Sequence, residues 1–153
     1  MKKVTLLFSL ILMVNLSFAQ VEDVKFTGDK SIEDESDEIF KVVDEMPFFP
    51  GCESETDKFE KKKCADTKML IFIYKNVKYP DIAKKKEIEG KVIVRFYVER
   101  DGTLSNIEIA RDIGGGCGEA ALDVVKMMPS WNPGLQKGNP VRVEYLVPVK
   151  FKL

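Results

Sequence analysis

Three stretches of sequence decide the fold of this chain: YPDIA (79–83), EGKVIVRFYVERDG (89–102) and PVRVEYLVPVKF (140–151). In the second and third stretches nearly every other residue is apolar, which is the period of a β-strand with one buried face. Asp101-Gly102 closes the second stretch, and this dipeptide is a strong signal for a tight turn between antiparallel strands. These patterns predict strands over residues 91–100, 104–111 and 141–151.

Helical periodicity precedes and interrupts these strands. Residues 56–77 predict a helix that ends at Tyr79-Pro80, because the residue before a proline disfavours helix. The expected buried face holds Phe59, Leu70, Ile73 and Val77, and Met69 and Phe72 widen it toward the C-terminal end. Residues 81–86 allow one or two further helical turns. A second helix is predicted over 119–128, ended by Pro129, and we expect Trp131 to be buried against that helix and the sheet.

The order of elements predicts an α+β domain, in which helices cover one face of a small three-stranded antiparallel sheet. A strand that returns after a helix is not a simple hairpin partner of the strand before it. We therefore expect the last strand beside the first, which gives the order 104–111, 91–100, 141–151.

Residues 79–153 resemble the C-terminal domain of TonB, the periplasmic energy transducer. The resemblance covers about half the chain, and its elements follow in the family's order and spacing. It implies the α-β-β-α-β fold and binding of the short N-terminal segment of outer-membrane receptors, which adds as a strand to the last strand of the domain. The motif and structural positions that it assigns are Tyr79, Pro80, Gly90, Asp101, Gly102, Trp131 and Pro148.

The N-terminal part of the chain has the features of a secretory signal. Lys2-Lys3 is followed by a mostly apolar run of about thirteen residues and by Ser17-Phe18-Ala19, whereas a membrane-spanning helix needs about twenty. We expect residues 1–19 to be removed and the protein to be periplasmic; an uncleaved signal would instead anchor it in the inner membrane.

Between the signal and the domain, we expect residues 20–45 to form an acidic flexible tether, since they are poor in large apolar residues. Residues 46–78 would then comprise an extended strap, MPFFPG, and the first helix. A full transducer keeps its anchor and has a long proline-rich spacer. Here we expect the N-terminal segment to be cleaved, and the tether is short, acidic and nearly free of proline. Both features argue against coupling to the inner-membrane complex.

The composition argues against catalysis and bound cofactors. The chain has no histidine and a formal net charge of −1, which removes imidazole chemistry and gives no reason to expect nucleic acid as a partner. The run Gly114-Gly115-Gly116-Cys117-Gly118 precedes a helix, but Glu119 follows where a phosphate loop needs Lys-Ser/Thr. We expect no enzyme activity, no metal, no cofactor and no small-molecule substrate.

Three cysteines in an oxidising compartment leave several pairings open. Cys52–Cys64 would close a short loop worth about 3 kcal/mol, and we favour it. Cys117, at a helix start where a thiolate is favoured, is the alternative partner or a free thiol.

Pro148 sets the expected binding surface. Proline lacks an N–H, so within a sheet it fits where the missing donor points off an edge. Backbone groups of alternate residues share a direction, which predicts that Arg142, Glu144 and Leu146 offer outward N–H and C=O groups to a partner strand. The partner would be an outer-membrane receptor or another envelope protein. The alternative is an envelope interaction or oligomerisation module, such as a homodimer, that is not coupled to the proton-motive force.

We predict that Gln20 is the first residue of the mature protein, because the apolar run is short and small residues end it. Mass spectrometry of protein isolated from the cell envelope checks this prediction. Recovery of the full-length chain from the inner membrane would contradict it.

Overall fold

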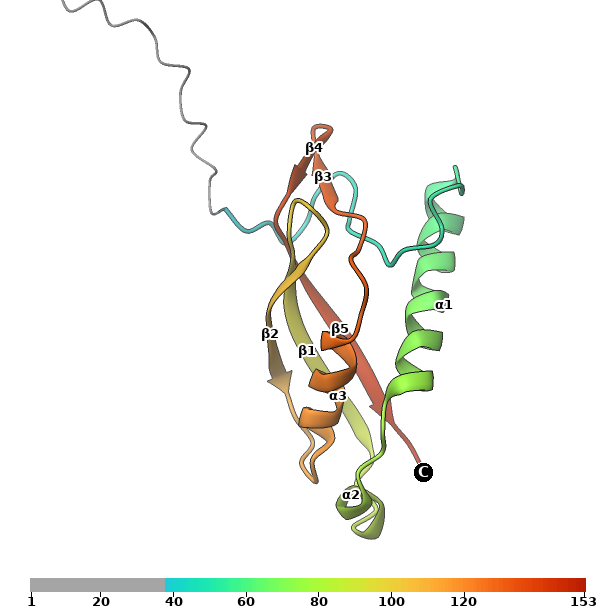
Figure 1. Ribbon diagram of the computed structural model, residues 1–153, viewed down its shortest axis with the longest axis vertical. Coiled ribbons are helices and arrows are strands. Elements are labelled where there is room, and N and C mark those ends of the chain that lie inside the picture. The colour runs from blue at the N-terminus through green and yellow to red at the C-terminus, as the bar shows by residue number, and fades with distance from the viewer. Residues whose placement is uncertain (1–37) are drawn as a thin grey trace, which may run out of the picture. The chain divides into compact units, whose positions relative to one another are not determined.

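The computed structural model describes residues 38–153. The predicted signal peptide, its cleavage site and residues 20–37 of the predicted tether lie outside the described residues. The elements are α1 (Lys58–Asn76), α2 (Asp81–Lys85), β1 (Gly90–Val98), β2 (Leu104–Arg111), α3 (Cys117–Lys126), β3 (Gly134–Gln136), β4 (Asn139–Val141) and β5 (Val143–Phe151) (Figure 1). No helix within residues 38–153 has the length and apolar character needed to cross a membrane.

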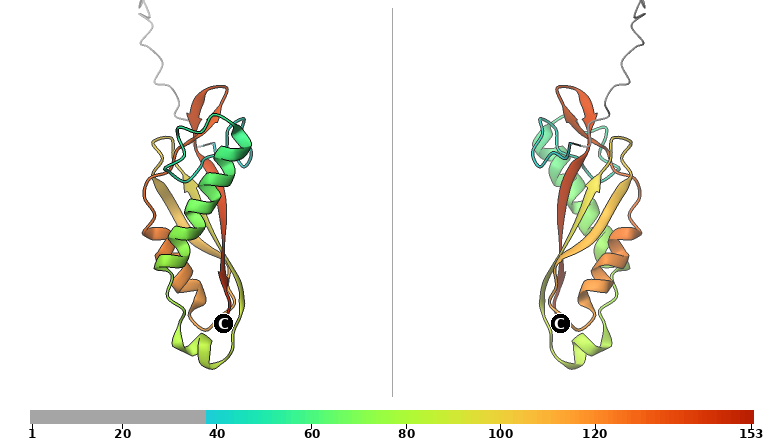
Figure 2. Two further views of the ribbon diagram at one scale, coloured as in Figure 1. Left: turned by 90° about the vertical axis from the view of Figure 1, so that its right-hand side faces the viewer. Right: turned by 90° about the vertical axis from the view of Figure 1, so that its left-hand side faces the viewer.

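The main sheet has the order β2-β1-β5, and both strand pairs are antiparallel. This confirms the predicted fold class and strand order. Figure 2 shows α1 and α3 on one side of this sheet and the strands without a covering helix on the other. The helix-free face carries the ion pair between Arg95 of β1 and Glu108 of β2.

The core lies between the sheet and the two long helices. Val92, Val94, Phe96 and Val98 of β1 are fully buried, as are Val143, Val147 and Val149 of β5. These positions are the apolar members of the alternating patterns, so the period of two in the sequence places one face of each strand in the core.

The first helix buries only part of the expected face. Asp57 caps α1, because its carboxylate accepts hydrogen bonds from the N–H groups of Phe59 and Glu60. The buried residues of α1 are Ala65, Met69 and Ile73, spaced four apart. Of the predicted face, Met69 and Ile73 are buried and Phe72 and Val77 are partly buried. Phe59 is 73% exposed and Leu70 is 40% exposed.

The strap reaches further toward the N-terminus than predicted. Phe40 pairs with Val143, Glu45 with Leu135 and Phe48 with Asn132. Residues 38–45 therefore lie on the domain, and the expectation of a flexible tether through residue 45 is wrong for them. Backbone hydrogen bonds to other segments, which composition does not reveal, hold them there.

A small hairpin of β3 and β4 was missed at the sequence level. Lys137 and Gly138 join its strands with φ values of 51° and 78°, and positive φ at both central residues is the geometry of a tight hairpin turn. Val141 ends β4, so the predicted strand over 141–151 is interrupted at Arg142. The helix predicted over residues 119–128 is α3, which begins earlier than expected, at Cys117.

Trp131 joins the strap to the sheet, and it is only 4% exposed. Its ring centroid lies 4.9 Å from that of Tyr145, 5.4 Å from that of Phe96 and 5.8 Å from that of Phe49 in the strap. The indole Nε1–H is buried and has no hydrogen-bond partner among the described residues. The surrounding residues therefore provide aromatic contacts for the Trp131 ring but no hydrogen-bond acceptor for its Nε1–H.

Gly102 allows the turn between β1 and β2 to approach Trp131. Its φ is +85°, and a Cβ atom there would lie 2.0 Å from the carbonyl oxygen of Trp131. The carbonyl of Gly102 in turn accepts a hydrogen bond from the Trp131 N–H at 2.8 Å. Gly102 thus serves both the turn and the docking of the 131–132 segment.

We predict that Trp131→Ala lowers the free energy of unfolding by about 3–5 kcal/mol, because it empties a large core site. Denaturant unfolding measures the change. Phe59→Ala is the matched control and should change the free energy by less than about 0.5 kcal/mol, since that ring is exposed. A loss below about 1 kcal/mol for Trp131→Ala would contradict the packing described above.

We also predict that Gly102→Ala is more destabilising than Gly138→Ala. Both glycines have positive φ, but a Cβ at Gly138 meets nothing within 4 Å. Gly138→Ala should cost about 1 kcal/mol from backbone strain alone. Gly102→Ala should cost about 2–4 kcal/mol, because the Trp131 carbonyl must also move. Equal losses in thermal unfolding would show that the close approach does not matter.

Candidate functional site: the free edge of strand β5

β5 lies at an edge of the main sheet and pairs with β1 in an unbroken antiparallel register from Gly90–Phe151 to Val98–Val143. On its other side, no strand of the described chain continues the sheet. An edge strand presents a row of unpaired N–H and C=O groups to any chain that can lie beside it.

Pro148 fixes which groups point off this edge. It lies opposite Ile93, and its missing N–H requires that this pair carries no ladder hydrogen bonds. The backbone groups of even-numbered β5 residues therefore point away from β1. The hydrogen bonds of Phe40 agree, since they reach the carbonyl of Arg142 and the N–H of Glu144.

Phe40 already occupies the start of this edge. Its N–H donates to the Arg142 carbonyl at 2.9 Å, and its carbonyl accepts from the Glu144 N–H at 2.8 Å, in a parallel bridge. In Figure 1 this segment is the cyan chain that crosses near β4. Along the rest of the edge, residues 38–153 provide no partner strand for the Leu146 N–H or for the carbonyls of Glu144, Leu146 and Pro148.

The side chains of Arg142 and Leu146, two of the three predicted edge residues, differ in environment. Arg142 donates to Glu99 Oε2 at 2.8 Å and lies over the ring of Tyr97. Burial disfavours ionisation of Glu99, but hydrogen bonds from Arg142 and Ser105 outweigh it and lower its pKa. Leu146 is 52% exposed. The edge therefore begins at a fixed ion pair and continues into an accessible apolar side chain.

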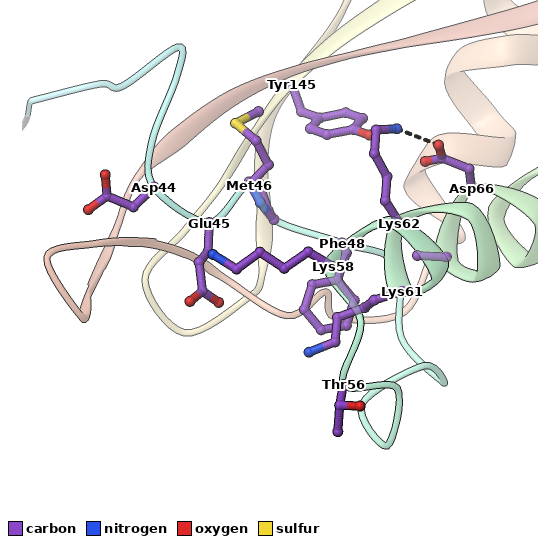
Figure 3. A pocket seen from close by; sticks show the side chains of 12 residues that line it. Asp44, Glu45, Met46, Phe48, Thr56, Lys58, Lys61, Lys62, Asp66 and Tyr145 are labelled. Atoms are coloured by element: carbon purple, nitrogen blue, oxygen red, sulfur yellow. Dashed lines mark hydrogen bonds and ion pairs between the residues drawn. The ribbon is translucent and has the colours of Figure 1, made fainter.

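One hollow opens beside the start of β5. It has a volume of about 440 Å³ and lies between the strap, α1 and Tyr145 (Figure 3). Tyr145 extends from β5 toward Lys62, which forms an ion pair with Asp66. Burial raises the pKa of the Tyr145 hydroxyl, so this group stays neutral and is available for hydrogen bonding.

A second hollow of about 320 Å³ lies at the other end of β5. Its lining includes Tyr74, Val77, Tyr79 and Phe151, with Lys150 and Lys152 as charged neighbours. Tyr145 and Phe151 both project from the core face of β5, so each end of the edge strand borders a recess. A strand added along β5 would place some of its side chains near these recesses.

The other predicted motif residues are structural and lie away from the edge groups. Tyr79 donates its hydroxyl proton to the Ile88 carbonyl at 2.6 Å and packs edge-on against Phe151. Pro80 starts α2. Gly90 begins β1, where a Cβ would come within 3.2 Å of Ile113.

The turn residue Asp101 is held by its neighbour. Its carboxylate accepts from the N–H and hydroxyl of Thr103 at 2.9 and 2.6 Å. Hydrogen bonds from Thr103 lower the pKa of Asp101, so the turn keeps an ionised aspartate at neutral pH. This geometry leaves no reason to assign Asp101 a chemical role.

A disulfide joins Cys52 to Cys64 and ties the strap to α1. Cys117 is a free and buried thiol. The sequence placed it at a helix start where a thiolate is favoured, but burial, with Asp112 and Glu119 nearby, raises its pKa instead. Cys117 therefore serves as a small apolar core residue.

Glu53 adds a second link between the strap and the segment after Trp131. Its carboxylate accepts from the Gly51 N–H at 2.8 Å and from the Asn132 side-chain amide at 2.9 Å. These hydrogen bonds lower the pKa of Glu53 to about 2. A folded-state pKa below the unfolded value contributes stability above the unfolded pKa, and this contribution is lost as the pH falls toward 2.

Sequence reasoning missed Phe40 because it lies in an acidic segment. The available signal was the run Ile39-Phe40-Lys41-Val42-Val43, which is the largest apolar concentration between residues 20 and 45. Composition over a long window concealed this short run.

These observations define a small α+β domain with an accessible edge strand, and comparison with known proteins identifies its family. Residues 75–153 match the family described as Gram-negative bacterial TonB protein C-terminal. The chain belongs to this family, whose members are periplasmic or envelope-associated and interact with outer-membrane receptors in general. No curated protein matches the chain.

Two solved structures are similar to part of the chain. One is the NMR solution structure of the Helicobacter pylori TonB C-terminal domain, residues 179–285. It has 24% sequence identity and a TM-score of 0.45, covering 57% of this chain and 78% of that one. The other is a shorter form, residues 194–285, with 23% identity and a TM-score of 0.43, covering 56% and 90%.

Proposed function

We propose that this protein binds extended segments of outer-membrane TonB-dependent receptors, which add as a strand to the free edge of β5, and so supports energy-coupled transport. Family membership supports a TonB-like role. The observation that carries the finer proposal is the row of outward backbone groups after Glu144, which has no partner strand within residues 38–153. Such binding needs no catalytic group, so we infer a binding role without enzyme activity.

The geometry favours a short partner strand. Leu146 is the central position, since both its N–H and its C=O point outward, whereas Pro148 offers only a carbonyl. Each backbone hydrogen bond contributes about 1 kcal/mol net, so a few such bonds give weak binding unless side chains add to it. The two recesses beside Tyr145 and Phe151 are where partner side chains would add affinity.

We further propose that the mature protein is periplasmic and acts after removal of residues 1–19. A chain that kept this segment in the inner membrane would have residues 20–39 as its spacer, because pairing with the domain begins at Phe40. Fully extended, such a spacer reaches about 70 Å, shorter than the roughly 90 Å that a spacer through residue 45 would allow. This short reach favours a freely diffusing receptor-binding protein over a membrane-anchored one.

We predict that Leu146→Pro abolishes binding of receptor-derived peptides. The substitution removes the only free outward N–H between Glu144 and Lys150, and the ladder to β1 does not use this N–H. Pro148 shows that a proline is tolerated two residues further along the same side of the strand. Titration calorimetry with synthetic peptides, copied from the N-terminal segments of the organism's outer-membrane receptors, measures the effect.

Leu146→Ala is the matched control, because it shortens the exposed side chain and keeps the N–H. It should weaken binding by less than about fivefold, the worth of roughly 1 kcal/mol. Unchanged binding by a folded Leu146→Pro variant would refute pairing at this edge. A concentration-dependent dimer that Leu146→Pro disrupts, in a protein that binds no receptor peptide, would favour the oligomerisation alternative instead.

A further inference from the structure

The edge proposed for receptor segments is partly occupied by the chain itself. Phe40 uses the Arg142 carbonyl and the Glu144 N–H, both of which point off β5. A partner strand that extends to the start of β5 needs the same two groups. Phe40 lies outside the family match at residues 75–153, so the matched family region does not include this segment.

The occupying segment is held less firmly than the strap that follows it. Within residues 38–42, the backbone hydrogen bonds to the rest of the described chain are the two made by Phe40. Its neighbours are exposed, Ile39 by 39% and Val42 by 81%. Displacing residues 38–42 therefore breaks two hydrogen bonds and uncovers little apolar surface apart from the half-buried Phe40 side chain.

Anchoring begins at the next residue. Val43 is only 9% exposed. Asp44 accepts from the Lys137 N–H at 2.8 Å through its carboxylate, and its N–H donates to Gln136 Oε1 at 3.1 Å. Glu45 exchanges two backbone hydrogen bonds with Leu135, of 3.0 and 2.8 Å. Residues 38–42 can leave β5 while residue 43 onward stays in place, and the chain bends at residues 41 and 42, just before the anchored part.

We propose that residues 38–42 are an intramolecular competitor for the partner strand, and that receptor segments displace Phe40 to gain the full edge of β5. This inference rests on the proposed function. With such a competitor, the apparent association constant equals the intrinsic constant multiplied by the fraction of molecules in which the edge is open. One net backbone hydrogen bond corresponds to a factor of about 5 in an equilibrium constant, so the two made by Phe40 correspond to a factor of about 5 to 30.

Phe40→Pro tests the competitor, because it removes the N–H that donates to Arg142. Ile39→Pro is the matched control, since alternation points the residue 39 N–H away from β5. Phe40→Ala keeps the N–H and removes the ring, so it separates the contribution of the side chain from that of the backbone hydrogen bonds. Thermal unfolding first verifies that each full-length variant retains its fold, which is expected because the anchors from Val43 onward are unchanged.

Two probes are used: the receptor-derived peptides, and a synthetic peptide that copies residues 37–44 of this chain. Phe40→Pro should bind both at least about 5-fold more tightly than the unmodified protein, the factor for the one hydrogen bond that it removes, and up to about 30-fold if the bond from the Glu144 N–H is lost with it. Ile39→Pro should bind them as tightly as the unmodified protein. Amide hydrogen exchange gives an independent measurement on the unmodified protein. Partner binding should slow exchange at Leu146 and speed it at Phe40.

Two results together would overturn the inference: equal affinities of Phe40→Pro and the unmodified protein for the probes, and a Phe40 N–H that stays protected from exchange when the unmodified protein binds its partner. Failure of the proposed function looks different: receptor peptides bind no variant, and exchange at Leu146 stays unchanged when they are added. In that case tighter binding of the 37–44 peptide by Phe40→Pro would still support displacement, and equal binding would refute it.

Discussion

The missing N–H of Pro148 constrains more of this domain than any single contact. A proline inside a strand fits only where no ladder donor is needed, so it makes β5 an edge strand and fixes the parity of its pairing with β1. Backbone and side-chain directions alternate with the same period of two. The same parity therefore buries Val143, Val147 and Val149, leaves Leu146 accessible, and aims the Leu146 backbone away from the sheet. A slip of one residue would reverse all of these at once.

The strap depends on this sheet, although it precedes the matched family region. Phe49 packs against Trp131, and Trp131 packs against Phe96 and Tyr145 of β1 and β5. The buried Trp131 Nε1–H without a partner is a cost that the ring contacts offset. Since the Cys52–Cys64 disulfide fixes the strap to α1, helix, strap and edge strand form one packed unit.

The parts of the fold that follow from the sequence are those governed by local period and turn chemistry. Alternation in β1 and β5 and the Asp101-Gly102 turn predict the sheet and its order. The buried face of α1 followed only in part, because apolar residues lie on more than one side of this helix. Met69 and Ile73 are buried as expected, but Ala65 is buried while Phe59 and Leu70 are exposed. For the candidate site, Pro148 indicates which residues face outward, but the pairing of Phe40 depends on a contact across about a hundred residues that no local pattern encodes.

An exposed edge strand exposes a protein to uncontrolled sheet growth, and this chain limits its edge at both ends. Phe40 covers the groups at Arg142 and Glu144, and Pro148 removes a donor four residues beyond Glu144. Between these limits only Leu146 presents both an N–H and a C=O, too short a row to template a second copy of a long strand. A partner that supplies enough contacts to displace Phe40 gains the remaining groups. The competing segment therefore raises the binding threshold, so that the edge pairs with a well-matched segment in preference to any extended chain.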